Sequence, residues 1–414
     1  MAANRRPVFN RPVFDRRAVF NRPVFNRRAV LRGGLALGLA GGVLGGVAGV
    51  ADLAAGRRPT PATGGQLRIG YLPITDAAPL LVGHAQGRFA AAGVGSARPV
   101  LFRSWESLAQ AFLAGELDVV HLLMPFAVQL RYALGAQVRV VAWNHTNGSA
   151  LTVAPSVRGV EDLAGHSVAI PFWWSIHNVL LQRMLRGAGL RPVVRESPSV
   201  AARTVQLVVM SPADMLPALH TGTIGGYIVA DPFNAAAELR KVGKIARFVG
   251  DVWADHACCA VVVRQELVDA APHAVQAVTD AVAGAQRWIG ANRPQTAALL
   301  TADRYLPQPL PAVTRALTRA ATDPVLQVRH PSWHGERMGF RPYPFPSYTA
   351  ALVDAMRDTV VDGDRRFLDR LDPAGVHGAL VDDRFVLRSI NTLGGPAAFD
   401  LPGSLLRTEE VQLT

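Results

Sequence analysis

From residue 67 onward, short apolar runs alternate with longer segments whose apolar side chains recur every three or four positions. The short runs predict buried strands, and the longer segments predict amphipathic helices. The first expected strands are residues 67–71, 99–102, 119–123 and 138–143, separated by expected helices at 78–92, 105–114 and 125–134. This βαβα order predicts a largely parallel sheet covered by helices.

A second set of the same kind begins near residue 150. Its expected strands are residues 151–154, 167–170, 205–210, 225–229 and 259–263, with a helical turn at 160–165 and a helix ending near 187. Helices are also expected through about 290, at 308–321 and at 348–361. Ser104, Ser175 and Ser211 precede expected helices as candidate caps. The second set is inserted in the first, which predicts two α/β lobes with a cleft between them.

The turn from 171 to 178, with the sequence PFWWSIHN, joins an expected strand to an expected helix. Such a turn lies at the carboxyl edge of the sheet, where ligands bind and where the helix offers unpaired N–H groups. The turn is therefore a candidate ligand wall. The alternative is that Trp173 and Trp174 only cover the sheet and that His177 is a satisfied histidine.

Composition supports a globular protein, because half of the 414 residues are hydrophobic and 18% are charged. The formal charge of +12 is unevenly placed: residues 1–56 hold nine arginines and two aspartates. The remaining chain has an ordinary balance and no basic block with interleaved aromatic residues. We therefore expect no nucleic-acid partner.

The first 56 residues resemble a targeting segment. Residues 5–32 contain an eleven-residue repeat, whose last copy carries the twin arginine Arg27-Arg28 before an uncharged run at 33–51. This order resembles a twin-arginine export signal, with cleavage expected near Ala55 and the twin-arginine export machinery as a partner. The competing hypothesis is a membrane anchor, which the eight glycines of the run weaken. A linker is expected at 57–66.

Cys258 and Cys259 are adjacent within the apolar run 257–263. In an oxidising compartment they could form a strained ring disulfide, but two small buried hydrophobic residues are the favoured interpretation. The chain has no C-x-x-C pair and no H-E-x-x-H motif, so we expect no metal site and no cofactor.

Several segments, in this order and spacing, resemble the nitrate/bicarbonate/taurine family of solute-binding proteins for ABC importers, above all its nitrate- and bicarbonate-binding branch. The segments are residues 70–80, 104–105, 113–121, 147–153, 175–178, 210–215 and 229–235. The resemblance implies a type II periplasmic-binding fold, with two α/β lobes joined by two crossings. It covers roughly residues 67–361 and implies a first part of lobe 1 at 67–148, lobe 2 at 149–250, a return to lobe 1 at 251–361 and a C-terminal extension at 362–414.

The resemblance also implies which residues hold the ligand. In the nitrate and bicarbonate binders the ligand contacts a tryptophan, a glycine segment and a histidine, which Trp105, Asn147-Gly148 and His177 match here. Further candidates near the cleft are Thr75, Asp76, Trp174, Asp231 and His256, although Asp231 is alternatively a helix cap.

The sequence departs from that of the nitrate binders in one segment, and this difference bears on the charge of the ligand. Nitrate binders place a lysine shortly after the segment matched by 251–253, and residues 254–259 contain none. A buried anion would then depend on N–H donors or on protonated His177 or His256.

The resemblance implies a monomeric, non-enzymatic receptor outside the cytoplasm that passes a small solute to the permease of an ABC importer. One alternative is an enzyme or single-turnover protein on the same fold, using His177 or a thiol in pyrimidine or quinone chemistry. Another is an exported sensor that docks on a membrane kinase.

Overall fold

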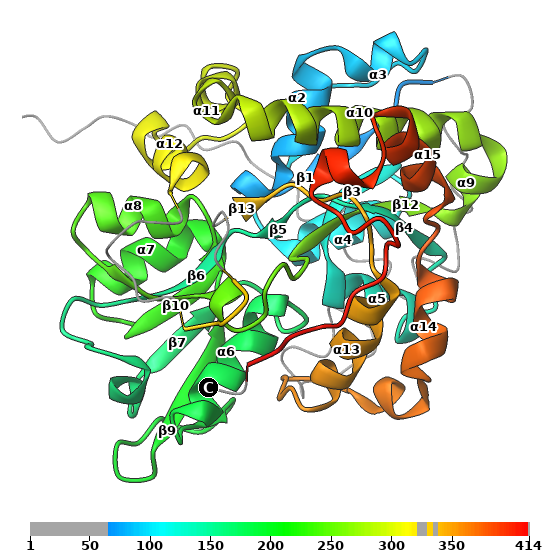
Figure 1. Ribbon diagram of the computed structural model, residues 1–414. Coiled ribbons are helices and arrows are strands. Elements are labelled where there is room, and N and C mark those ends of the chain that lie inside the picture. The colour runs from blue at the N-terminus through cyan, green and yellow to red at the C-terminus, as the bar shows by residue number, and fades with distance from the viewer. Residues whose placement is uncertain (1–64, 321–328, 334–337, 413–414) are drawn as a thin grey trace, which may run out of the picture. The chain divides into compact units, whose positions relative to one another are not determined.

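The computed structural model describes residues 65–320, 329–333 and 338–412 (Figure 1). Contacts divide the chain after Gly45, and every described residue lies in the second unit. The expected signal region, its alternative as an anchor and most of the linker therefore lie outside the described residues. Among the described helices, none combines the length and the apolar character that crossing a membrane requires.

Lobe 1 is built on a five-stranded sheet with the order β2-β1-β3-β12-β4. Its strands are β1 (Ile69–Tyr71), β2 (Val100–Leu101), β3 (Val119–Leu123), β4 (Val138–Trp143) and β12 (Cys259–Arg264). The first three are parallel, and β12 runs antiparallel to both β3 and β4. A strand from late in the sequence thus enters the middle of the sheet that the first strands begin.

The helices that follow the lobe 1 strands largely match the predicted ones. They are α2 (Ala78–Ala85), α3 (Arg88–Ala91), α4 (Trp105–Leu113), α5 (Met124–Tyr132), α9 (Gln265–Ala270) and α10 (Pro272–Ala291). Ser104 caps α4 as predicted, since its Oγ accepts a hydrogen bond from the Ser107 amide at 3.1 Å. The single helix predicted at 78–92 is wrong, because Gly87 adopts a left-handed φ of 65° between α2 and α3.

Lobe 2 is built on a six-stranded sheet with the order β11-β6-β10-β7-β9-β8. Its strands are β6 (Ser149–Val153), β7 (Ser167–Ile170), β8 (Arg191–Val193), β9 (Thr204–Val209), β10 (Gly226–Ala230) and β11 (Lys244–Phe248). Strand β6 is antiparallel to β10 and β11, whereas the other neighbours are parallel. The helices of this lobe are α6 (Ile176–Gly187), α7 (Pro212–His220) and α8 (Phe233–Leu239).

Two helix starts in lobe 2 differ in how they are capped. Ser175 caps α6 as predicted, because its Oγ accepts a hydrogen bond from the Asn178 amide. Ser211 precedes α7, but its hydroxyl donates to the Arg103 carbonyl at 2.9 Å and makes no cap. The capping prediction for Ser211 is therefore wrong, because its side chain instead links α7 to the segment before α4.

The chain crosses between the two sheets at two places. The first crossing runs from β4 to β6 through β5 (Thr146–Asn147), which pairs with β13 (Met338–Gly339). The second crossing runs from β11 to β12 through the short helix η3 (Val249–Asp251). The two crossings lie side by side, since Thr146 bridges Ala257 and the Asn147 amide donates to the His256 carbonyl.

The chain after β12 packs on both lobes and on the second crossing. The helices are α11 (Arg293–Ala302), α12 (Leu310–Thr318), α13 (Pro346–Arg357), α14 (Pro373–Leu380) and α15 (Arg384–Thr392). Helix α15 contacts α10 and β4. Near the end of the chain, Glu409 accepts a hydrogen bond from the indole N–H of Trp253. The C-terminal extension is thus part of the packed structure.

Candidate functional site

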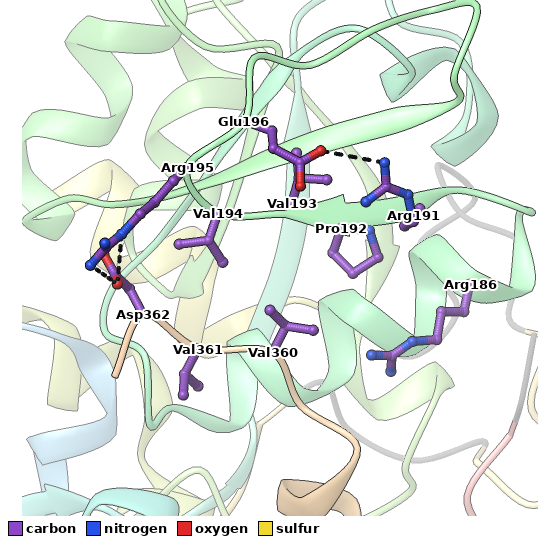
Figure 2. A pocket seen from close by; sticks show the side chains of 10 residues that line it. All are labelled: Arg186, Arg191, Pro192, Val193, Val194, Arg195, Glu196, Val360, Val361 and Asp362. Atoms are coloured by element: carbon purple, nitrogen blue, oxygen red, sulfur yellow. Dashed lines mark hydrogen bonds and ion pairs between the residues drawn. The ribbon is translucent and has the colours of Figure 1, made fainter. Parts of the chain in front are cut away.

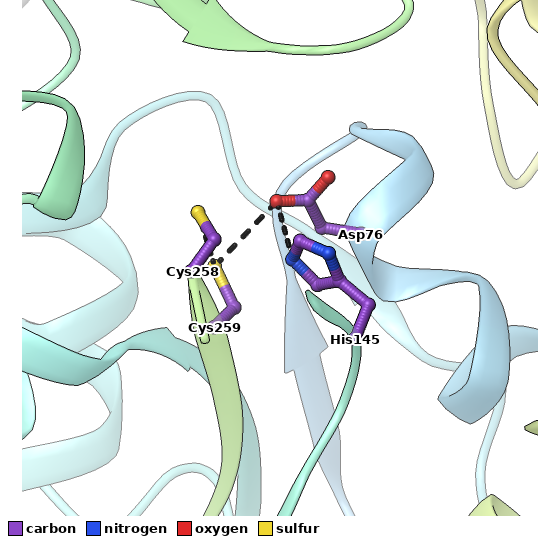
Figure 3. Close-up of side chains that lie close together, drawn as sticks. All are labelled: Asp76, His145, Cys258 and Cys259. Atoms are coloured by element: carbon purple, nitrogen blue, oxygen red, sulfur yellow. Dashed lines mark hydrogen bonds and ion pairs between the residues drawn. The ribbon is translucent and has the colours of Figure 1, made fainter. Parts of the chain in front are cut away.

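Four buried side chains capable of binding a metal lie together where the two crossings meet lobe 1 (Figure 3). Asp76 lies in η1 (Thr75–Ala77) after β1, and His145 lies between β4 and β5. Cys258 precedes β12, and Cys259 is its first residue. All four side chains are completely shielded from solvent.

We call these four side chains the Asp76–His145–Cys258–Cys259 cluster. The contacts between them are short. Asp76 Oδ2 lies 2.7 Å from His145 Nε2 and 3.9 Å from Cys259 Sγ. The two sulfur atoms are 3.7 Å apart, and both cysteines are free thiols. His145 Nε2 has no aligned hydrogen-bond partner among the described residues, so its approach to Asp76 is an ion pair by distance alone.

Burial and mutual charge perturb the acid–base behaviour of the cluster. Burial raises the pKa of Asp76 to about 7, although His145 opposes the shift. Burial alone would lower the pKa of His145, but the Asp76 carboxylate outweighs it and raises the pKa to about 10. Burial also disfavours the Cys258 thiolate, yet the hydrogen bond with Cys259 and the nearby His177 and His145 rings hold its pKa well below the usual value. The Asp76 carboxylate therefore stabilises the protonated form of His145.

His177 links this cluster to lobe 2. It lies in the first turn of α6, and its Nε2 is 2.9 Å from the Ser149 hydroxyl of β6 and 3.8 Å from Cys258 Sγ. Its Nδ1 is buried and has no hydrogen-bond partner among the described residues. The turn identified as a candidate ligand wall thus brings His177 to the boundary between the lobes.

Trp105 and His121 form a second group of buried polar side chains. The ring of Trp105 in α4 lies 5.8 Å from the ring of His121 in β3. Within the described chain, neither the indole N–H of Trp105 nor either ring nitrogen of His121 has a hydrogen-bond partner. Burial lowers the pKa of His121 to about 3, so its ring is neutral at physiological pH.

His256 occupies the second crossing. Its Nδ1 is 2.7 Å from the Trp253 carbonyl, whereas its Nε2 is buried without a hydrogen-bond partner in the part of the chain that the structure describes. Burial lowers the pKa of His256 to about 4. This ring is therefore not a fixed cation that replaces the missing lysine.

Asn147 and Gly148 shape the first crossing. Both have left-handed backbone conformations, with φ values of 59° and 80°. The Asn147 amide group exchanges two hydrogen bonds with Asp255, at 3.1 and 3.0 Å. Its side chain is thus committed to holding the two crossings together, which differs from the ligand contact expected of it.

Thr75 and Asp231 join the two lobes. The Thr75 amide and hydroxyl both donate to the Asp231 carbonyl at 2.8 Å. The Asp231 carboxylate accepts a hydrogen bond from the Ala235 amide at 3.2 Å, which is the capping role considered as its alternative. Burial raises the pKa of Asp231.

Trp174 faces a different part of the molecule. It is buried and packs edge-on against Phe367 of the C-terminal extension, with ring centroids 5.6 Å apart. This contact assigns Trp174 a packing role, in contrast to the ligand contact that we expected.

The sequence patterns missed the site role of His121, His145 and the two cysteines. His145 follows the predicted strand 138–143 by two positions and precedes Asn147-Gly148. Its place just beyond the end of a strand is the signal that could have identified it as a site residue. The interpretation of the cysteines as buried residues without a disulfide is confirmed, since both are fully buried free thiols, but no short motif joins them to other ligands. Their partners Asp76 and His145 lie more than a hundred positions away along the chain.

An open cavity of about 560 Å³ lies elsewhere, where β8 meets the segment after α13 (Figure 2). Arg195 pairs there with Asp362 at 2.7 Å, and Arg191 approaches Glu196. A neighbouring cavity shares Arg186 and Val360 with it. Neither cavity is lined by the buried histidines and cysteines, so we place the candidate site at the crossings.

Comparison with known proteins gives a family and a fold. The model of the NMT1-like family matches residues 61–302. The nitrate/nitrite binding protein NrtA of Nostoc sp. is 26% identical over 242 residues, which cover 53% of each chain. The bicarbonate transport ATP-binding protein CmpC of Synechococcus elongatus is 26% identical over 265 residues, covering 59% of this chain and 38% of that protein. The chain thus spans about half or less of the length of these relatives.

A solved structure supports the architecture directly. The periplasmic nitrate-binding protein NrtA of Synechocystis superposes with a TM-score of 0.67 at 18% identity, covering 85% of this chain and 94% of that one. At this identity the likeness establishes the fold alone. It confirms the predicted two-lobed α/β periplasmic-binding fold.

Proposed function

The chain belongs to the NMT1-like family, and from this premise we propose that it is a solute-binding protein, which captures a small solute outside the cytoplasm and delivers it to an ABC importer. The proposal includes the permease of that importer as the partner. It also includes passage through the twin-arginine export machinery, which rests on the residues 1–56 alone.

One observation carries the proposal. Several nitrogen atoms are buried without a hydrogen-bond partner among the described residues: Trp105 Nε1 and both ring nitrogens of His121 in lobe 1, His177 Nδ1 in lobe 2 and His256 Nε2 in the second crossing. Buried polar groups are almost always hydrogen-bonded in native proteins. Unpartnered polar atoms contributed by both lobes and by the second crossing are what a site for a small polar solute requires.

The chemistry of these atoms favours a small oxyanion. The Trp105 indole N–H donates, and the neutral His121 ring has one N–H to donate. His256 Nε2 instead accepts, because the Nδ1 of the same ring donates to the Trp253 carbonyl. The helix α6 begins at Ile176 next to His177, so its positive end also faces this region. The relatives NrtA and CmpC are named for nitrate, nitrite and bicarbonate. We propose an oxyanion of this size as the solute, held by N–H donors in place of the lysine absent from 254–259.

A thermal-shift screen of the purified chain tests this function. A ligand that binds only the folded state raises the melting temperature, by an amount that grows with its concentration. We expect a rise with nitrate, nitrite or bicarbonate, and none with chloride at the same ionic strength. A rise in melting temperature only with a methylated pyrimidine or an amine would show that the solute is an organic molecule and not an oxyanion. Sustained product formation by the purified chain would contradict a receptor role.

A further inference from the structure

We propose that Asp76, His145, Cys258 and Cys259 form a four-coordinate site for a thiophilic divalent metal ion of the Zn²⁺ type. This site goes beyond the proposed solute-binding role and does not depend on it. Three features of the cluster point to such a site: the geometry of the four donor atoms, their chemical types and their position in the fold.

The donor atoms are arranged as a small metal ion requires. One ligand atom from each residue lies within 4.8 Å of all the others. Zn–S bonds of about 2.3 Å at tetrahedral angles place two sulfur atoms about 3.8 Å apart, and a sulfur and an oxygen about 3.5 Å apart. The observed separations are 3.7 Å between the two sulfurs and 3.9 Å from Cys259 Sγ to Asp76 Oδ2. Shifts of a few tenths of an ångström complete these edges of the tetrahedron.

A third edge, between His145 and Asp76, also favours a shared cation. Their nitrogen and oxygen lie 2.7 Å apart without hydrogen-bond alignment at the nitrogen. Two atoms with lone pairs need a proton or a metal ion between them at such a distance. A metal ion would separate them to about 3.3 Å, as expected for Zn–N and Zn–O bonds of about 2.0 Å.

The chemical types of the donors select the class of ion. Two thiolates, one imidazole and one carboxylate are ligands that Zn²⁺ accepts together, whereas Ca²⁺ and Mg²⁺ prefer oxygen ligands alone. Asp76 and the two cysteines would carry up to three negative charges in the protein interior. Among the described residues, the ion pair recorded for Asp76 is with His145, and all four side chains are fully buried. A divalent cation would offset this buried negative charge.

One neighbouring residue, His177, supplies outer support to a proposed ligand, Cys258. His177 Nε2 lies 3.8 Å from Cys258 Sγ and 2.9 Å from the Ser149 hydroxyl. The second oxygen of Asp76, Oδ1, and Nδ1 of His145 are buried without partners in the described chain. The cluster thus retains hydrogen-bonding capacity that ordinary core packing does not explain.

The position of the cluster gives the site a structural consequence. Its ligands come from the end of β1, from the first crossing and from the end of the second crossing. A bound ion would tie both crossings to the lobe 1 sheet. Because the ligands are fully buried, binding and release of the ion require a local opening of this region.

Cobalt titration of the purified, reduced and metal-free chain tests the proposal. Co²⁺ takes the place of Zn²⁺ in thiolate sites and gives a sulfur-to-cobalt charge-transfer band together with strong visible bands in tetrahedral coordination. We expect both signatures to saturate at one Co²⁺ per chain. We expect Zn²⁺ to bleach them and Mg²⁺ or Ca²⁺ to leave them unchanged.

Variants assign the ligands. Cys258→Ser and Cys259→Ser should each weaken the charge-transfer band and lower the Co²⁺ affinity by more than about 100-fold, which is the upper range for the loss of an outer partner. Asp76→Asn should lower the affinity while it retains the band from both thiolates. His220→Gln changes an exposed histidine of lobe 2 and should have no effect. Circular dichroism of each variant shows whether it is folded.

Three results would overturn the proposal. The first is the absence of a thiolate band in reduced, folded wild-type protein. The second is a band that persists unchanged in Cys258→Ser and Cys259→Ser. The third is a reduced chain that binds no metal while alkylation shows both thiols to be free. Because solute binding is read separately by the thermal-shift screen, failure of the metal site and failure of the proposed receptor role remain distinguishable.

Discussion

At the scale of single residues, the site combines side chains that no local pattern joins. Capping by Ser104 and Ser175 could be predicted because a cap and its helix are neighbours in sequence. The group formed by Asp76, His145 and Cys258 could not, since the topology of the sheet brings these residues together over long sequence separations. The resemblance to the family proposes Trp105 and His177 as ligand contacts, and both side chains are buried.

Ser149 offers a test of how His177 is positioned. Its hydroxyl is 2.9 Å from His177 Nε2, and both side chains are buried. Ser149→Ala removes this hydrogen bond and should weaken solute binding by on the order of 1 kcal/mol, the usual net worth of such a bond. Ser167→Ala, which removes a hydroxyl bonded to Gln206 in the same sheet, is the matched control and should leave the affinity unchanged. Calorimetric titration measures the affinity of both variants for the solute. An equal loss of affinity in the two variants would contradict the positioning role of Ser149.

At the scale of elements, periodicity predicted most strands and helices but not their spatial order. Strands β3 and β4 have the predicted bounds of Val119–Leu123 and Val138–Trp143, because long apolar runs bounded by polar residues are strong signals. The antiparallel insertion of β12 between β3 and β4 was not predicted, since strand order depends on tertiary contacts. The C-terminal extension likewise had no expected place, although its residues pack on α10, on β4 and against Trp253.

The first crossing provides a test at this scale. Gly148 has a φ of 80°, and a Cβ there would lie 2.6 Å from the end of the Met338 side chain. Gly148→Ala should lower the free energy of unfolding by the left-handed strain of about 1–2 kcal/mol and by a further amount, because the flexible end of Met338 must shift to admit the Cβ. Gly87 has a φ of 65° with open space around it. Gly87→Ala should therefore lower the free energy of unfolding by about 1–2 kcal/mol, which is the cost of left-handed strain without crowding. Urea unfolding compares the two, and an equal loss would show that contact with Met338 is unimportant.

At the scale of the whole molecule, two α/β sheets are joined by two adjacent crossings, and buried polar side chains from both lobes meet there. Direct hydrogen bonds from Thr75 to Asp231 and from Ser211 to Arg103 also join the lobes in this arrangement. Separating the lobes would break these contacts. This architecture is consistent with a protein that encloses a small ligand between its lobes.

Isothermal titration calorimetry with the oxyanion identified by thermal shift is the most direct measurement of the central claim. The account predicts one solute per chain, with binding weakened about tenfold or more in Trp105→Phe, which keeps the aromatic packing but removes the unpartnered indole N–H. Trp174→Phe makes the same change beside Phe367 and should bind like the wild type. Saturable one-to-one binding with this difference between the two variants would support a solute-binding protein with its site at the crossings. Equal affinities in both variants, or no binding of any solute by the folded chain, would contradict it.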